Sequence, residues 1–224
     1  MTTPATTSRA GGSRLRLSRE RVLQAAVALA DEHGLDAMSM RRLAQELGVE
    51  AMSLYHYFAN KGELLGGMLD AVSAEMELPS PEGEWRSALR SAAISAHETL
   101  LRHPWACSLL MTPTGPSPAR LRWMDSILGR LRGAGFSPEM THHGYHALDS
   151  HIVGFTLWLL PYMALSQAQP DFAERFVAAT PLEELPHLAE HIDVHLSERA
   201  GDTNEFEFGL DLILDGLARS LPSG

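Results

Sequence analysis

Residues 52–65, MSLYHYFANKGELL, gather side chains that can bond anionic oxygen atoms. Two tyrosine hydroxyls, an imidazole ring and an ammonium group come from Tyr55, Tyr57, His56 and Lys61, which we call the aromatic–basic cluster. Such groups donate hydrogen bonds to phosphate oxygens. Aromatic rings have few rotatable bonds, so little conformational entropy is lost when they dock. The cluster therefore predicts contact with a polyanion.

Two further sets of residues have the spacing that would place metal ligands on one face of a helix. These sets are His187, His191 and His195, and His142, His146 and Asp149. Imidazole nitrogens and carboxylate oxygens are common ligands of zinc. Histidines on the solvated face of a helix are nevertheless the commoner outcome, so we expect no resident metal or cofactor. A metal-responsive site at His187, His191 and His195 stays open as an alternative.

The sequence lacks the motifs that most often mark a catalytic centre. It has no GxSxG nucleophile turn, no phosphate-binding glycine loop and no HExxH pair. The segment GAGF, residues 133–136, is explained more simply as a helix stop than as a nucleotide-binding loop. Cys107, the single cysteine, is expected to be a small buried hydrophobe. We therefore predict that the protein is not an enzyme.

A first helix is predicted ahead of the aromatic–basic cluster. Ser18 can cap its start, and Gly34 can end it. Its apolar face is expected to contain Leu23, Val27 and Ala30.

A second and a third helix follow at close spacing. The second is capped by Ser39, carries apolar residues at helical spacing and ends at Gly48. Only the tripeptide GVE separates it from a third helix over residues 51–57, in which Leu54 is expected to face the core together with Phe58. Two helices joined by a tight glycine turn form a helix-turn-helix, whose second helix enters the major groove of DNA. The pattern therefore predicts binding to double-stranded DNA.

The rest of the chain is also expected to be helical, so the predicted fold class is all-α. Asn60 and Glu63 can start a fourth helix that runs through Met76. Prolines and glycine in LPSPEGE, residues 78–84, then break the chain. Further helices are predicted over residues 85–101, 104–111, 118–132, 138–166 and 205–220, with one or two more between 171 and 199. We expect a disordered basic arm over 1–17, a DNA-binding domain over 18–77 and a second domain over 78–224.

Charge is unevenly distributed along the 224 residues, which have a formal net charge of −10. Residues 1–62 carry +2, and the remainder carries −12. A basic N-terminal part joined to an acidic remainder favours a polyanion partner for the N-terminal part alone. The most apolar run, residues 152–165, is too short to span a bilayer, and the N-terminus has no secretory signal. We expect a cytoplasmic protein with no membrane partner.

The segment SMRRLAQELGVEAMSLYHYFANKGELL, residues 39–65, strongly resembles the DNA-binding segment of the tetracycline-repressor (TetR) family. Weaker likeness extends through PEGEWRSALRSAA, LRGAGFSPE, GFTLWL and FEFGLDLILDGL. The resemblance implies an all-α homodimer that releases operator DNA when a small ligand binds the larger domain. It also implies DNA contacts from Ser39, Arg41, Ala51, Met52, Ser53, Tyr55, His56 and Tyr57, and a phosphate contact from Lys61. Apolar Ala51 and Met52 could contact thymine methyl groups.

The same resemblance allows a comparison of ligand-binding positions. At positions where the tetracycline repressor holds its magnesium–drug complex, this chain has Ala92, Ala96, Leu110 and Tyr162. These side chains are poor metal ligands, so tetracycline is not the expected effector. Aromatic residues that could line a pocket for a hydrophobic or planar effector are Trp105, Trp123, Phe155, Trp158 and Tyr162. Pro161 could kink its helix and open a cavity.

The last predicted helix is apolar on more than one side, which suits a helix buried against a partner. With part of residues 138–166 it would form a four-helix interface between two copies of the chain. The expected protein is a repressor that is released from a palindromic operator by an apolar or aromatic small molecule. The second alternative is a helical ligand-binding module that does not bind DNA.

Overall fold

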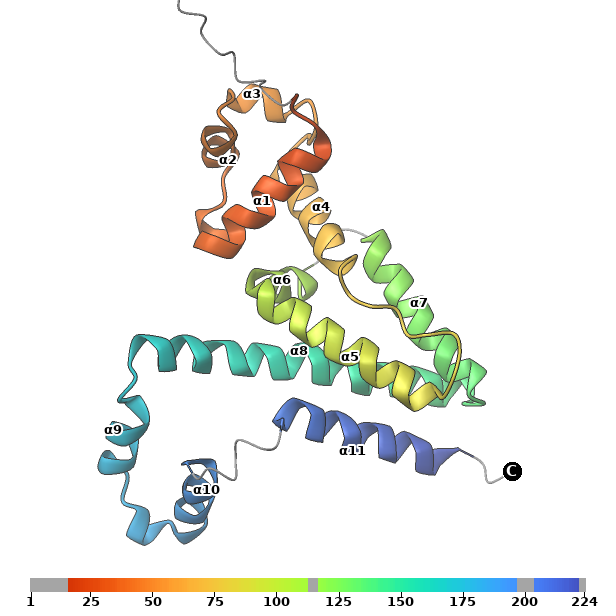
Figure 1. Ribbon diagram of the computed structural model, residues 1–224, viewed down its shortest axis with the longest axis vertical. Coiled ribbons are helices and arrows are strands. Elements are labelled where there is room, and N and C mark those ends of the chain that lie inside the picture. The colour runs from red at the N-terminus through yellow and green to blue at the C-terminus, as the bar shows by residue number, and fades with distance from the viewer. Residues whose placement is uncertain (1–15, 113–116, 197–203, 222–224) are drawn as a thin grey trace, which may run out of the picture.

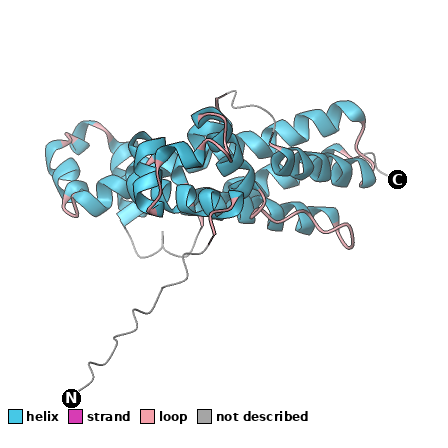
Figure 2. Ribbon diagram, turned by 90° about the horizontal axis from the view of Figure 1, so that it is seen from above, coloured by secondary structure: helices cyan, strands magenta, loops and turns pink. Residues whose placement is uncertain are grey.

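The computed structural model of the chain describes residues 16–112, 117–196 and 204–221. Within these ranges the chain is helical and contains no strand, which confirms the all-α prediction (Figures 1 and 2). The helices of eight or more residues are α1 (Arg19–His33), α2 (Met40–Leu47), α4 (Lys61–Ser73), α5 (Trp85–Arg102), α7 (Pro118–Gly133), α8 (Pro138–Ala168), α9 (Phe172–Ala179), α10 (Pro186–Leu196) and α11 (Glu205–Ser220). The shorter ones are η1 (Leu35–Ala37), α3 (Ala51–Leu54), α6 (Pro104–Leu110) and η2 (Leu182–Glu184).

The first four α-helices begin and end largely where local sequence dictates. The side chains of Ser18, Ser39 and Asn60 accept hydrogen bonds from the amides of Arg21, Arg42 and Glu63, as N-caps do. Gly48 has φ 65° and ψ 33°, a left-handed conformation that makes the tight turn between α2 and α3.

Three details of this region differ from the sequence prediction. The third helix ends at Leu54 instead of continuing to residue 57, and α4 ends at Ser73 instead of Met76. The buried face of α1 is formed by Val22, Ala26, Leu29 and Ala30, whereas Leu23 and Val27 are only half-buried. The face is rotated because α1 packs against both α2 and α4, and periodicity alone does not show where those neighbours lie.

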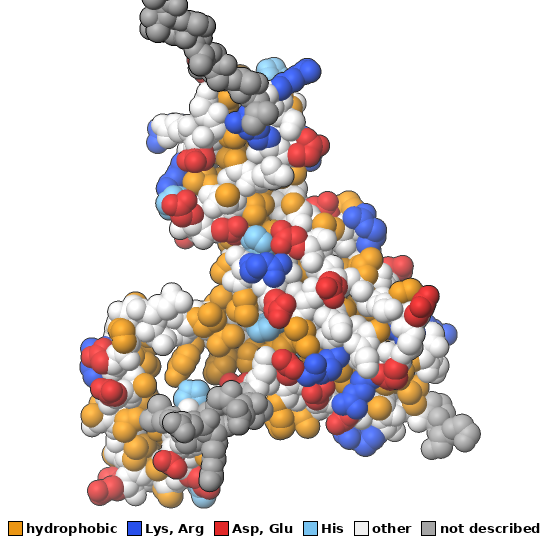
Figure 3. All heavy atoms as spheres, viewed as in Figure 1, with side chains coloured by type: hydrophobic (Ala, Val, Ile, Leu, Met, Phe, Trp, Pro, Cys, Tyr) orange, Lys and Arg blue, Asp and Glu red, His pale blue; other side chains and the backbone are white. Residues whose placement is uncertain are grey.

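The helices form two connected groups (Figure 1). Helices α1, α2 and α3 surround the upper part of α4, and α4 runs from them towards α6 and α7. Below, α5, α7 and α11 pack along α8. Helices α9 and α10 extend away from the end of α8, and the space-filling view is hollowed between them and the body (Figures 1 and 3). The predicted arm over residues 1–17 lies outside the described residues except for Arg16 and Leu17.

Helix α8 is longer than the apolar run seen in the sequence, and it continues through Pro161 to Ala168. By length and composition it is the one described helix that could cross a membrane, and 22% of its most apolar 18-residue window is buried within the protein. A single such helix is weak evidence for a membrane span, because a core helix passes the same test. Its large exposed apolar side chains include Trp158, Tyr162 and Met163.

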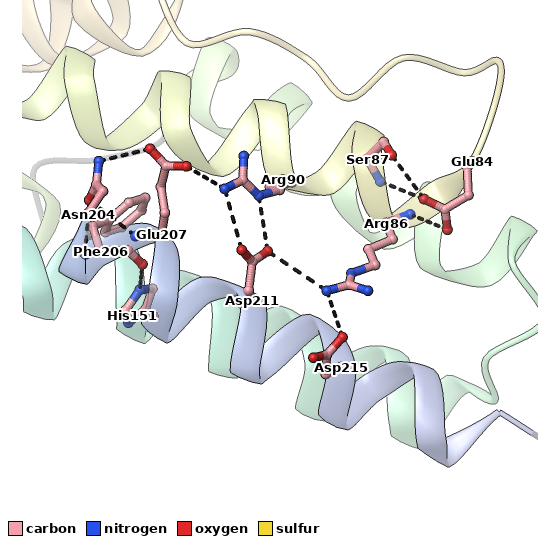
Figure 4. A network of polar contacts seen from close by, with 10 residues as sticks. All are labelled: Glu84, Arg86, Ser87, Arg90, His151, Asn204, Phe206, Glu207, Asp211 and Asp215. Carbon is pink, nitrogen blue, oxygen red and sulfur yellow. Dashed lines mark hydrogen bonds and ion pairs between the residues drawn. The ribbon is translucent and has the colours of Figure 1, made fainter. Parts of the chain in front are cut away.

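Helix α11 is held along α5 by a row of ion pairs (Figure 4). Arg90 donates to Asp211 Oδ1 at 3.0 Å and also pairs with Glu207, and Arg86 pairs with Asp215 at 2.6 Å. Surface pairs stabilise a protein little one by one, but a row of them fixes the register of two helices. The register leaves an apolar stripe of α11 exposed, with Phe208 at 59% and Leu212 at 56%.

A buried histidine lies where α5, α8 and α11 meet. The ring of His97 stacks on Phe206 with 3.9 Å between ring centroids. Thr156 donates its hydroxyl proton to the Ile152 carbonyl oxygen at 2.6 Å, so His97 Nδ1 donates to Thr156 Oγ1 at 2.7 Å. Burial lowers the pKa of His97 from 6.5 to about 4, and positive charge on His151 acts in the same direction.

This histidine should make the fold sensitive to acid. The unfolded chain takes up a proton at His97 near pH 6.5, whereas the folded protein resists protonation down to about pH 4 because its pKa is lowered. Stability is therefore lost as the pH falls from 6.5 towards 4, by about 2 kcal/mol at pH 5 through this group. Urea unfolding of wild type and His97→Gln at pH 8 and pH 5 measures this. Between pH 8 and pH 5, the free energy of unfolding of the variant should fall by about 2 kcal/mol less than that of the wild type. Equal losses in the two proteins would contradict the assignment.

Candidate nucleic-acid interface and effector pocket

The predicted recognition segment presents its aromatic–basic face to solvent. Met52 is 71% exposed and Tyr55 is 45% exposed, and His56 is exposed beside them. Leu54 and Phe58 are fully buried beneath this face, as predicted. The buried pair anchors the segment to the core, so the exposed side chains are held on a rigid support. A rigid support lowers the entropic cost of docking on DNA.

Two members of the aromatic–basic cluster also make bonds within the protein. The Tyr57 hydroxyl donates to the Leu17 carbonyl oxygen at 2.8 Å, which ties the segment ahead of α1 to the turn after α3. The Lys61 ammonium group donates to the Met38 carbonyl oxygen at 2.8 Å. An ammonium group has three N–H donors, so Lys61 retains donors for a phosphate, whereas the only hydroxyl proton of Tyr57 is already engaged.

The remaining predicted DNA contacts lie around the start of α2 and along α3. Ser39 is exposed, and its hydroxyl oxygen accepts from the Arg42 amide at 3.2 Å, which leaves its proton free to donate. Arg41 is exposed and makes no side-chain hydrogen bond or ion pair within the part of the chain that the structure describes. Ala51 and Ser53 are half-buried on either side of Met52. The structure thus brings Arg41, Met52, Tyr55 and His56 to exposed positions on adjoining helices.

The predicted ligand-binding residues do not converge on one site. Ala92, Ala96, Trp105 and Trp123 are buried in the core. Phe155 packs in a ring cluster with His97, His151, Phe206 and Trp158. Trp158 and Tyr162 stack on each other near the exposed end of α8, with 6.4 Å between ring centroids. Of the predicted set, Leu110 alone lines the cavity described next.

A cavity of about 500 Å³ lies between α4, α6, α7 and α8. This volume is within the range of roughly 300–1,000 Å³ that pockets for small organic ligands usually have. Apolar side chains that line it include Leu69, Leu109, Leu110, Leu121, Val153 and Leu157. Its polar lining includes Arg120, Tyr145 and Asp149. We call this cavity the effector pocket, after the role that is proposed for it below.

The effector pocket is linked directly to the helix that carries the DNA-binding helices. Leu69, in α4, lines the pocket, and its neighbour Asp70 accepts hydrogen bonds from the start of α7. The donors are the Ala119 amide at 2.7 Å and the Ser117 hydroxyl at 3.0 Å. Ser117 itself lines the pocket. A molecule that displaces Ser117 or Leu69 therefore acts on α4.

A second link joins α1 to the start of α6. Asp31 Oδ1 accepts from Trp105 Nε1 at 2.6 Å and lies 2.8 Å from His103 Nδ1. The other ring nitrogen of His103 lies 3.3 Å from Glu75, just beyond the end of α4. Trp105, predicted as an effector contact, is therefore placed where the two groups of helices join. No pattern in the sequence around Asp31 pointed to this bond.

The two histidine sets do not form metal sites in the structure. Among the described residues, no three histidine, cysteine, aspartate or glutamate side chains are grouped closely enough to hold a metal ion. His191 and His195 stack with ring centroids 6.3 Å apart, and His195 Nε2 lies 3.4 Å from the Tyr162 hydroxyl. Asp149 pairs with Arg120 rather than lying with His142 and His146. The geometry gives the metal-responsive alternative no support.

An exposed aromatic face on a helix-turn-helix, joined through α4 to a helical domain with a pocket, defines a ligand-responsive DNA-binding regulator. Residues 22–68 match the family model described as bacterial regulatory proteins of the tetR family. Residues 78–221 match the model of the tetracyclin repressor-like C-terminal domain. The chain belongs to the TetR family of transcriptional regulators. It is a DNA-binding repressor that responds to a ligand, and it is not an enzyme.

Relatives of known name agree with this assignment. The chain is 34% identical over 221 residues to the HTH-type transcriptional repressor DrrR1 of Streptomyces coeruleorubidus, covering 92% of this chain and 79% of that protein. It is 32% identical to the class A tetracycline repressor of transposon 1721 from Escherichia coli, covering 91% and 92% of the two chains. The structure is similar to that of Streptomyces coelicolor ActR in complex with actinorhodin, with a TM-score of 0.73, 28% identity, and 93% and 100% coverage.

Proposed function

We propose that the protein represses transcription from a near-palindromic operator and is released when an apolar or aromatic small molecule fills the effector pocket. The observation that carries this proposal is the pair of hydrogen bonds from Ser117 and Ala119 to Asp70. They join the pocket wall to α4, whose other end supports the recognition segment. An effector that favours one position of α4 shifts the population away from the DNA-binding form.

Binding to the operator would use the helix-turn-helix of residues 18–77. We assign phosphate contacts to Ser39, Arg41, Lys61 and Tyr55, and base-edge contacts to Ala51, Met52, Ser53 and His56. Tyr57 would act mainly by positioning the segment, because its hydroxyl is bonded to Leu17. Residues 78–224 would form the ligand-binding and dimerisation domain.

The second copy of the chain would pack against α8 and α11. Trp158 on α8 and Phe208 and Leu212 on α11 are large exposed apolar side chains. Such side chains on two neighbouring helices are typical of a four-helix interface between two copies. A dimer presents two recognition segments to half-sites about one helical turn apart. We place this dimer in the cytoplasm, where it meets the chromosomal DNA.

The effector of this chain would be an apolar or aromatic molecule other than tetracycline. ActR has been crystallised with actinorhodin. The leucine and valine side chains in the wall of the effector pocket suit apolar, ring-containing molecules.

Lys61→Ala should weaken DNA binding and also reduce its dependence on salt. Lys61 is exposed and close to the recognition segment, so loss of one phosphate contact should lower the slope of log affinity against log salt by about 1. Fluorescence anisotropy at four salt concentrations measures the slope. Met52→Ala, which removes no charge, is the matched control and should change the preferred sequence instead. An unchanged slope in Lys61→Ala would refute the phosphate contact.

Release by an effector is tested by displacement. The purified protein first selects a duplex from random DNA, and this duplex is labelled. Planar molecules and molecules with acyl chains are then added to the complex of the protein with this duplex. The proposal expects release by ring-containing molecules that also raise the melting temperature of the free protein. Molecules that bind and stabilise the protein without releasing DNA would contradict the proposed mechanism.

A further inference from the structure

The effector pocket holds one ion pair in a wall that combines apolar side chains with a few uncharged polar ones. Arg120 in α7 pairs with Asp149 in α8, and the two side chains are only 16% and 27% exposed. The guanidinium carbon also lies 4.5 Å from the ring centroid of Trp123, which is buried behind it. A charge kept at the wall of an apolar pocket costs free energy of desolvation, so its presence points to a role in ligand binding.

The two partners of this pair differ in how far their hydrogen bonding is satisfied. Asp149 accepts from Arg120, and its carboxylate also acts on the neighbouring Tyr145 hydroxyl. Burial, more than the carboxylate, raises the pKa of Tyr145, so its hydroxyl stays protonated and remains a donor. Arg120 has five N–H donors, and only one of its terminal nitrogens is bonded to Asp149 within the described residues. The arginine therefore retains donors, whereas the aspartate is already paired with a cation.

The remaining donors of Arg120 set a condition on the ligand. A molecule that fills the pocket removes water from these N–H groups, and an unpaired buried donor is costly. An anionic oxygen on the ligand would satisfy them with charge-assisted hydrogen bonds. A cationic ligand would instead have to displace Arg120 from Asp149 while lying next to the guanidinium group. This difference between Arg120 and Asp149 favours an anionic ligand over a cationic one.

We propose that the effector is an apolar, ring-containing acid whose anionic oxygen, a carboxylate or an ionised phenol, binds Arg120. This inference rests on the proposed function, because it names the chemistry of the ligand for the same pocket. The anion competes with Asp149 for the guanidinium group and so loosens the tie between α7 and α8. The start of α7 is bonded to Asp70 in α4, which gives the same event a route to the DNA-binding helices.

Three probes of nearly equal shape test the charge preference. They are 2-naphthoate, 2-naphthamide and 2-naphthylmethylammonium, titrated by calorimetry into the dimeric protein at pH 7.5. The anion should bind at least about tenfold more tightly than the neutral amide, and the cation most weakly. In Arg120→Gln the ratio of anion to amide affinity should fall to about one, and Arg120→Lys should restore part of it.

Two controls separate recognition from loss of packing. Arg122→Gln removes the same charge from an exposed position of the same helix and should leave the ratio unchanged. Asp149→Asn frees the guanidinium group and should leave anion binding equal or tighter. Melting temperatures and circular dichroism confirm that each variant folds.

The outcomes also separate this inference from the proposed function. Tightest binding of the cation, or an unchanged ratio in Arg120→Gln, overturns the assignment to Arg120. Failure of all three probes to bind at millimolar concentration overturns it as well. If the protein still binds its operator selectively in those cases, the regulator stands and only the ligand chemistry is wrong. Loss of selective DNA binding in the wild type would instead refute the proposed function.

Discussion

Replacing Leu212 by arginine is expected to give a folded monomer that binds the full operator at least about 100-fold more weakly than wild type. Leu212 is exposed on α11, one helical turn from the exposed Phe208, and α11 packs along α8. In a symmetric interface the substitution would bury two unpaired guanidinium groups, one from each copy, which costs several kcal/mol. A monomer holds one half-site only, so the second binding event is lost.

Light scattering coupled to gel filtration measures the mass, and anisotropy measures operator binding. Leu78→Arg is the matched control, because Leu78 is an exposed leucine in the connection after α4. It should remain dimeric and bind DNA as wild type does. A Leu212→Arg protein that is still a dimer would show that the interface lies elsewhere.

Asp31→Ala is the second substitution with a large expected effect, and it should lower the free energy of unfolding by about 2–4 kcal/mol. The substitution removes the acceptor of the Trp105 indole and of His103 Nδ1, and both of these side chains are buried. Two buried donors would then lack partners. Since the bonds join α1 to α6, the variant should also weaken the effect of the effector on DNA affinity.

Urea unfolding measures the stability, and anisotropy with and without 2-naphthoate measures the coupling. Asp36→Ala, in the exposed turn after α1, is the control and should change stability by less than about 0.5 kcal/mol. Wild-type stability in Asp31→Ala would mean that water or another group replaces the carboxylate. Normal release of DNA by the probe would show that α1 and α6 are not coupled through Asp31.

Local features of the fold could be predicted from the sequence with little error. The caps at Ser18, Ser39 and Asn60 and the left-handed turn at Gly48 are decided by residues within a few positions of each other. The end of α3 was predicted less well, because the Tyr57 hydroxyl reaches Leu17, which is 40 residues away in the chain. Contacts of this kind have no periodic pattern.

The effector pocket could not be predicted from the sequence either, because it is also formed by residues that are far apart in the chain. Arg120 and Asp149 are 29 residues apart and lie on different helices, so nothing in their spacing predicts a pair. Asp149 was considered only as a metal ligand beside His146. Because the prediction looked for aromatic residues, it chose Trp105 and Trp123, which are buried in the core, whereas the pocket is lined by leucine and valine together with polar side chains. Alignment with the tetracycline repressor gave positions but not the direction of each side chain.

Selective binding to DNA is the central claim, and fluorescence anisotropy tests it most directly. Labelled DNA that flanks the gene of this protein is titrated with the purified dimer and compared with a scrambled duplex of equal length. We expect tight, salt-sensitive binding to the flanking DNA, at least about 1,000-fold weaker binding to the scrambled duplex, and loss of the difference in Tyr55→Ala. Equal affinity for both duplexes, together with no specific fragment recovered by genome-wide selection, would contradict the account.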